Sequence, residues 1–150
     1  MKNEDLKLSS SLTLPARMDS FGPFMDFIRE TGENLNLEDS LITRLGLAAE
    51  ELLVNVIHYA YAGAEEPGEI EMRCGMADAE MFCMIVRDRG TPFNPLQTEP
   101  PDTTKNVEER PVGGLGIFMV QELADHLAYS REKEANVLVF CKKVGRPREK

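Results

Sequence analysis

The chain has 150 residues, of which 42% are hydrophobic and 29% are charged, a balance typical of a folded globular protein rather than a disordered one. This length suits one domain around one core, so we expect residues 1–150 to form a single domain. The net charge of −9 and the pI near 4.8 give a surface that repels a phosphate backbone, so nucleic acid is not an expected partner.

Membranes and oxidising compartments are also unexpected. The sequence has no apolar run of roughly 18 residues, and residues 1–5 are charged where a secretory signal needs an apolar stretch. We therefore expect no membrane partner and a cytoplasmic location. Cys74, Cys83 and Cys141 are odd in number, lack CxxC spacing and lie in apolar runs, which predicts small core residues and neither disulfides nor a zinc site.

The first predicted elements are a strand and a helix. Leucines at even positions within residues 6–14 alternate with polar residues, which predicts a strand that ends at Pro15. Ser20 is a candidate N-cap for a helix that carries Pro23 in its first turn and stops at Gly32.

The clearest helical pattern covers about residues 38–61, where apolar residues recur on one side with helical periodicity, so this side should face a sheet. Strands are expected next. Residues 70–74 alternate apolar with polar side chains, and residues 81–86 are almost wholly apolar, which predicts a hairpin whose second strand is internal.

The last third begins with a polar, proline-rich stretch at residues 94–112, which predicts a long mobile loop. A third helix is expected from the glycines at 113–116 to about His126, followed by strands near residues 127–130 and 137–141. The predicted order is β-α-α-β-β-loop-α-β-β. It favours an α+β two-layer sandwich, with a mixed, mostly antiparallel sheet and helices on one face.

The second predicted helix carries a polar face. At 100° per residue, Arg44, Glu51, Asn55 and His58 fall within about 60° of one another, opposite the apolar stripe. Taken alone, this face is more typical of the solvated side of an amphipathic helix.

Two further motifs can bind a nucleotide. Asp88 and Gly90 follow a buried-type strand, where a carboxylate can accept from an exocyclic amine and a glycine lets a flat ring approach, although a strand-ending turn gives the same pattern. Gly113, Gly114 and Gly116 open a helix whose free N–H groups can hold phosphate oxygens. This run fits neither a P-loop nor the dinucleotide fingerprint, and a glycine turn that caps a helix is its plainer interpretation.

In this order, the motifs resemble the N-box, the adenine-reading box and the lid glycines of the GHKL ATPases. The runs Glu51-Leu52-Leu53-Val54-Asn55 and Gly113-Gly114-Leu115-Gly116-Ile117 look most like those of the anti-sigma-factor serine kinases of the RsbW type. The resemblance covers about residues 6–143. It implies a Bergerat-type ATP-binding fold, with ATP and Mg²⁺ as cofactors.

The resemblance also implies residue roles. Glu51 would be the general base, Asn55 a magnesium ligand and Asp88 the adenine contact. The ATP-binding set would comprise Asn55, Asp88, Gly90, Gly113, Gly114, Leu115 and Gly116. One departure concerns the last strand, which has no Ser or Thr where related domains place a hydroxyl near the aspartate, and Val139 stands at the expected position.

By resemblance, the chain is a serine kinase that sequesters a sigma factor and phosphorylates a STAS-type anti-anti-sigma protein, and such kinases commonly act as homodimers. The main alternative is an ATP-dependent interaction module of the same fold without kinase activity. A detached histidine-kinase catalytic domain lacks support, because the chain has no helical hairpin with a phosphoacceptor histidine. An unrelated hydrolase lacks its motifs as well.

Overall fold

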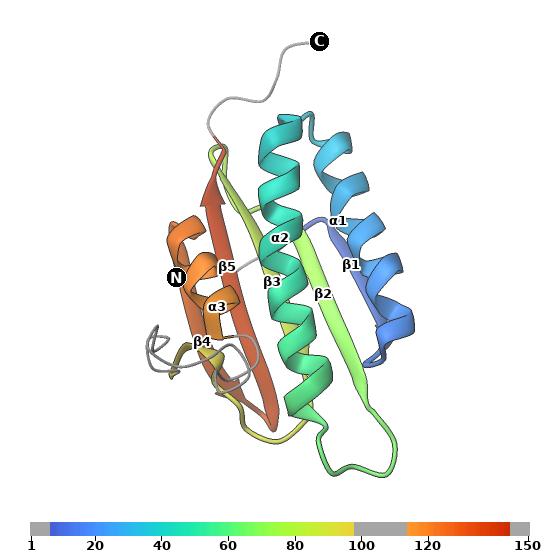
Figure 1. Ribbon diagram of the computed structural model, residues 1–150. Helices are drawn as coiled ribbons and strands as arrows, with labels where there is room; N and C mark the ends of the chain where they lie inside the picture. The colour runs from blue at the N-terminus through green and yellow to red at the C-terminus, as the bar shows by residue number, and fades with distance from the viewer. Residues whose placement is uncertain (1–6, 98–113, 145–150) are drawn as a thin grey trace.

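In the part of the chain that the computed structural model describes, residues 7–97 and 114–144, five strands form one sheet and three α-helices cover one of its faces. The strand order is β1-β2-β3-β5-β4, and each described pairing is antiparallel (Figure 1). The α+β two-layer sandwich is therefore confirmed. The strands and α-helices are β1 (Ser10–Pro15), α1 (Phe21–Asn34), α2 (Asp39–Asn55), β2 (Glu69–Met76), β3 (Met81–Asp88), α3 (Gly114–Leu123), β4 (His126–Glu132) and β5 (Ala135–Lys143).

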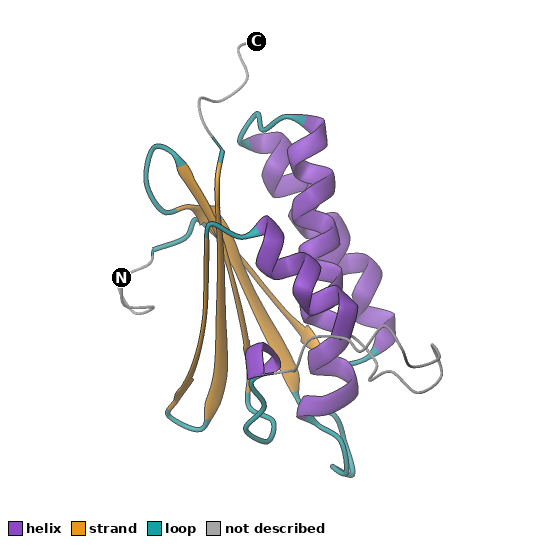
Figure 2. Ribbon diagram, turned by 60° about the vertical axis from the view of Figure 1, so that its left-hand side comes forward, coloured by secondary structure: helices purple, strands orange, loops and turns teal. Residues whose placement is uncertain are grey.

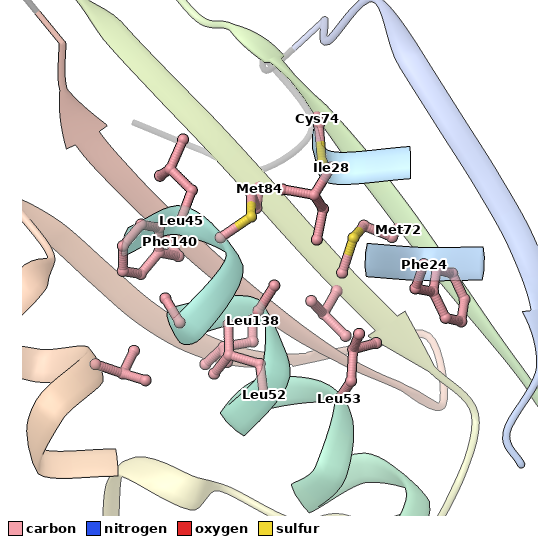
Figure 3. Close-up of a cluster of buried hydrophobic side chains, with 14 of the residues drawn as sticks. Phe24, Ile28, Leu45, Leu52, Leu53, Met72, Cys74, Met84, Leu138 and Phe140 are labelled. Atoms are coloured by element: carbon pink, nitrogen blue, oxygen red, sulfur yellow. The ribbon is translucent and has the colours of Figure 1, made fainter. Parts of the chain in front are cut away.

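The main core lies between the helix layer and the sheet, which Figure 2 shows edge-on. Alternation along the strands turns every second side chain toward the helices, and the periodic stripe of α2 faces them. Each large side chain that is fully buried there contributes about 1.5–3 kcal/mol. The labelled members of this core in Figure 3 are Phe24, Ile28, Leu45, Leu52, Leu53, Met72, Cys74, Met84, Leu138 and Phe140.

The first helix begins where the sequence predicts but ends later. Ser20 stands at the N-cap position of α1, although its side chain makes no capping hydrogen bond. The helix passes the expected stop at Gly32 and continues to Asn34, and Asn36 then takes a left-handed φ of 59°. Gly32 serves helix packing instead, because a Cβ atom there would lie 2.8 Å from Cγ1 of Ile42 on α2.

The second predicted helix is confirmed, with a change of winding near its end. The α-helical part stops at Asn55, and residues 56–60 continue as one π-helical turn, η3 (Val56–Ala60). π-Helical turns widen the helix by one residue per turn and often occur at functional sites. Here the wider turn directly follows Asn55 and ends at the buried Ala60.

The cysteines correct one expectation. Cys83 and Cys141 lie directly opposite each other on β3 and β5, with their Cα atoms 4.1 Å apart, and form a disulfide. Cys74 is a buried free thiol, as predicted. The sequence alone suggested no pair, since the two cysteines are separated by 58 positions and only the register of the sheet brings them together. The predicted loop at residues 94–112 lies mostly outside the described residues, which include its start and the 3₁₀ turn η4 (Pro95–Gln97).

Candidate functional site

The C-terminal end of β3 places Asp88 beside the start of β5. Asp88 pairs in register with Asn136, and both side chains are only 4% exposed. Oδ1 of Asp88 accepts hydrogen bonds from the backbone N–H of Gly90, at 2.8 Å, and from Nδ2 of Asn136, at 2.9 Å. A buried carboxylate with these donors keeps a defined orientation at the end of the strand.

Asn136 is a site residue that the sequence did not reveal, and the expectation about Val139 was wrong. Val139 pairs with Ile85, an odd number of residues away from the Asp88–Asn136 pair, so it points to the other face of the sheet. The residue opposite Asp88 is Asn136. The signal that would have identified it is the register of the two strands, which sequence patterning does not specify.

The segment that follows Asp88 docks on the end of the π-helical turn. The carbonyl oxygen of Ala60 accepts a 2.8 Å hydrogen bond from the backbone N–H of Thr91. A Cβ atom at Gly90 would lie 2.1 Å from the same oxygen, so only glycine fits at this position. Gly90 therefore acts through close backbone contact, and it ties the Asp88 segment to the end of η3.

Asn55 lies inside the site rather than on a solvated face. It is 4% exposed, and its Nδ2 has no hydrogen-bond partner among the described residues. Periodicity placed it opposite the apolar stripe of an isolated helix. In the folded chain, α3 lies beside α2 (Figure 1), and Phe93 and Pro95 of the segment after β3 line the same cavity as Asn55. A buried donor without a partner leaves a hydrogen bond for a ligand to supply.

A cavity joins Asn55 to Asp88. Its lining is mainly apolar, with a few polar groups, which is typical of sites that hold an aromatic ring or a cofactor. Phe93, on one wall, stacks against Tyr59 of η3, with ring centroids 5.1 Å apart. The lining residues are Leu52, Asn55, Val56, Val86, Asp88, Phe93, Pro95, Tyr129, Asn136 and Leu138.

Glu51 lies one turn before Asn55 and faces the start of α3. A Cβ atom at Gly116 would lie 1.8 Å from Oε2 of Glu51, so the carboxylate occupies the space that a side chain at 116 would need. Gly114 and Leu115 form the first residues of α3, and Gly113 lies outside the described residues. The structure thus brings Glu51 to the predicted glycine helix, near the positive end of its dipole.

Burial changes the acidity of both carboxyl groups. It raises the pKa of Glu51 above its ordinary value of 4.5, and the neighbouring charge of Glu50 raises it further. Burial also raises the pKa of Asp88, while hydrogen bonds from Asn136 and Gly90 and the charge of Arg131 act in the opposite direction. Arg131 also donates a 2.8 Å hydrogen bond to the carbonyl oxygen of Gly90.

Two residues of the predicted polar face do not join the cavity. Arg44 and His58 are exposed, and neither lines the cavity. The face therefore divides along its length. Its central pair, Glu51 and Asn55, turns toward α3 and the cavity, whereas Arg44 and His58 lie on the surface.

The arrangement has a counterpart among known families, because the model of the histidine kinase-like ATPase domain matches residues 14–142. The chain belongs to the histidine kinase-like ATPase domain family. The match covers all the described helices and the sheet except for most of β1 and the last residue of β5, and it confirms the predicted likeness to the GHKL ATPases.

Curated relatives of this ATPase domain include serine-protein kinases named RsbW. The protein from Bacillus mycoides (strain KBAB4) is 29% identical over 97 residues, which cover 62% of this chain and 59% of that protein. The protein from Bacillus cereus (strain AH187) is 29% identical over 102 residues, which cover 65% and 62% of the two chains. The aligned part thus spans about six tenths of the length of these relatives.

Solved structures confirm the fold of the ATPase domain. A crystal structure of the RsbU and RsbW domains of Rv1364c from Mycobacterium tuberculosis superposes with a TM-score of 0.63 at 16% identity, over 93% of this chain and 34% of that one. The histidine kinase domain of the blue-light activated kinase from Erythrobacter litoralis EL346 gives 0.53 at 17% identity, over 87% of this chain and 62% of that one. Within residues 7–97 and 114–144, no helix combines the length and apolar character needed to cross a membrane.

Proposed function

We propose that this chain is a single ATP-binding domain that transfers the γ-phosphoryl group of ATP to a serine of a STAS-type anti-anti-sigma protein and sequesters a sigma factor. The observation that carries the proposal is the placement of Glu51 and Asn55 one turn apart on α2. Asn55 enters the Asp88 cavity, and Glu51 meets the start of α3. The curated relatives named serine-protein kinase RsbW support the same activity.

The chemistry of the cavity lining suits an adenine ring at the Asp88 end. An ionised carboxylate only accepts hydrogen bonds, so Asp88 matches the exocyclic amine of adenine. The apolar side chains of Leu52, Val86 and Leu138 line the same cavity and suit the faces of a flat ring. Gly90 keeps the backbone next to Asp88 free of a side chain.

Asn55 would hold the metal and the phosphates. Magnesium in phosphate sites takes one or two protein oxygen ligands together with phosphate oxygens and water, and the amide oxygen of Asn55 can serve as one of them. Its Nδ2, which has no partner among the described residues, would donate to a phosphate oxygen. The free N–H groups at the start of α3 would bind further phosphate oxygens.

Glu51 would act as the general base. A carboxylate takes the proton of the attacking serine hydroxyl more readily when its pKa lies closer to neutral, and burial shifts the pKa of Glu51 in this direction. ATP, when bound, would supply the γ-phosphoryl group: its bond to the β-phosphate oxygen would break as the bond to the serine oxygen forms, ADP would leave, and magnesium would offset the negative charge. The remaining requirement for phosphoryl transfer is to position the reacting groups, and α2 and α3 would do this by holding Glu51, Asn55 and the phosphates in place.

The deciding experiment combines labelled ATP, magnesium and a serine-bearing STAS-type protein. We expect phosphoserine formation by the wild-type chain and a loss of roughly 100-fold or more in Glu51→Ala, since general-base catalysis contributes about this much. Glu30→Ala is the control, because it removes an exposed carboxylate on α1, outside the proposed site.

Two results would contradict the kinase proposal. Either equal transfer by wild type and Glu51→Ala, or no transfer to any serine-bearing partner, would exclude this catalytic role. ATP binding by such a chain would then favour the second function, an interaction module in which ATP selects the conformation that binds a partner. The buried donor of Asn55 is consistent with ATP binding in both cases.

A further inference from the structure

Asn136 uses all of its hydrogen-bonding capacity inside the protein. A carboxamide has two N–H donors and two acceptor positions on its oxygen. Nδ2 donates to Oδ1 of Asp88, at 2.9 Å, and to the carbonyl oxygen of Thr91, at 2.8 Å. Oδ1 accepts from the backbone N–H of Phe93, at 3.1 Å, and from the hydroxyl of Tyr129. Asn136 therefore has no further hydrogen bond to offer a ligand.

The backbone determines which way this amide points. The N–H of Phe93 can only donate and the carbonyl of Thr91 can only accept, so Nδ2 must face Thr91 and Oδ1 must face Phe93. The same orientation makes Nδ2 a donor toward Asp88. The Tyr129 hydroxyl reinforces it by donating to Oδ1 from the neighbouring strand β4.

The orientation of Asn136 is passed on to Asp88. Oδ1 of Asp88 accepts two hydrogen bonds, from Nδ2 of Asn136 and from the N–H of Gly90, and these two bonds fix the orientation of the carboxylate. Both bonds end on the same oxygen. An ionised Asp88 in this orientation offers its other oxygen as an acceptor, and it suits a ligand edge that carries an amine and disfavours one that carries a carbonyl.

We infer that Asn136, oriented by Tyr129, is a positioning residue that sets the preference of the site for a 6-aminopurine over a 6-oxopurine by holding Asp88. This inference rests on the proposed ATP site and adds the source of its base preference. It also explains how the site works without a Ser or Thr in β5, because the amide of Asn136 supplies the donor and the hydroxyl comes from Tyr129 on β4.

A matched pair of variants tests this role. Asn136→Thr and Asn136→Val have nearly the same shape, but only threonine retains a donor that can reach the residue directly opposite in the sheet. The measurement is the Kd of ATP and of ITP, its 6-oxo analogue, by calorimetry. Thermal unfolding of both variants shows whether they fold as the wild type does.

We expect wild type and Asn136→Thr to prefer ATP over ITP. In Asn136→Val the affinity for ATP should fall by about tenfold or more, the effect of losing a hydrogen bond to a charged group, while that for ITP changes little. Tyr129→Phe leaves both donors of Asn136 in place and should lower the preference less. If ATP and ITP affinities fell by equal factors in Asn136→Val, Asn136 would be only structural and the inference would be wrong.

A second measurement needs no nucleotide. Amide hydrogen exchange at Phe93 should accelerate in Asn136→Val, because this N–H loses its acceptor, while exchange at Ala77 in the distant β2–β3 turn should not change. Unchanged exchange at Phe93 would overturn the inference even if ATP binds. A wild-type chain that binds neither ATP nor ITP would overturn the proposed function and the base preference together, whatever the exchange shows.

Discussion

The carboxylate of Glu51 fills the space beside Gly116, so that a Cβ atom at position 116 would lie 1.8 Å from Oε2 and 2.0 Å from Cδ of Glu51. This contact joins the C-terminal part of α2 to the first turn of α3. It gives Gly116 a role that helix capping alone does not require, because the missing side chain leaves room for the proposed base.

Gly116→Ala should therefore displace Glu51 without unfolding the chain, since the displaced group is the end of a flexible side chain. We expect phosphoryl transfer to fall roughly 100-fold, as a misplacement of about 1 Å can cause. Gly22→Ala in α1 is the control, because a Cβ atom there meets nothing within 4 Å. Phosphotransfer assays on both variants check this, and full activity in Gly116→Ala would show that the position of Glu51 is unimportant.

Asp88→Asn should weaken ATP binding by at least about 1.4 kcal/mol, which is a tenfold change in affinity. An amide at 88 can still accept from Gly90 and Asn136, but it directs an N–H₂ group toward the amine of the base. Asp78→Asn is the control, since Asp78 caps the turn at the other end of β3 by accepting from the N–H groups of Glu80 and Met81. An unchanged dissociation constant in calorimetry would reject the assignment of Asp88.

The rate of phosphoryl transfer should depend on the ionisation of Glu51. The base is active when deprotonated, so the rate should fall as the pH drops through the pKa of Glu51, which lies above 4.5. Glu50→Gln removes the like charge and should shift this acidic limb to lower pH. Profiles of kcat/KM against pH in the two proteins provide the measurement, and coincident profiles would contradict the coupling.

The same pKa shift affects stability in the opposite sense. Because the folded state raises the pKa of Glu51 relative to the unfolded chain, it binds the proton more tightly. The stabilisation is fully present below the unfolded pKa and is lost as the pH rises through the folded one. The ionised form of Glu51, which would act as the base, is thus the form that lowers the stability of the folded state.

Reduction of the Cys83–Cys141 disulfide should lower the free energy of unfolding by about 2–4 kcal/mol, because the bond closes a long loop in the unfolded chain. Urea unfolding with and without a thiol reductant measures this difference. A double variant, Cys83→Ala with Cys141→Ala, should not respond to the reductant. Alkylation of all three cysteines in the unreduced, unfolded protein would show that the bond does not form.

Much of the fold follows from local patterns in the sequence. Periodicity of 3.6 identified α2, alternation identified β2, and the apolar run identified β3 as an internal strand. The end of α1 was placed too early, because Gly32 was taken as a stop when it provides close packing against Ile42. A glycine in a helical pattern gives no local sign of which role it has.

For the candidate site, the sequence by itself determined the residues that lie within one element, such as Glu51 and Asn55 one turn apart on α2. Only the tertiary structure decided which residues meet across elements, namely Asn136 opposite Asp88 and Glu51 against Gly116. The physical reason is the range of the interactions. Helical spacing is a property of consecutive residues, whereas strand register and helix contact arise only when distant segments share one core.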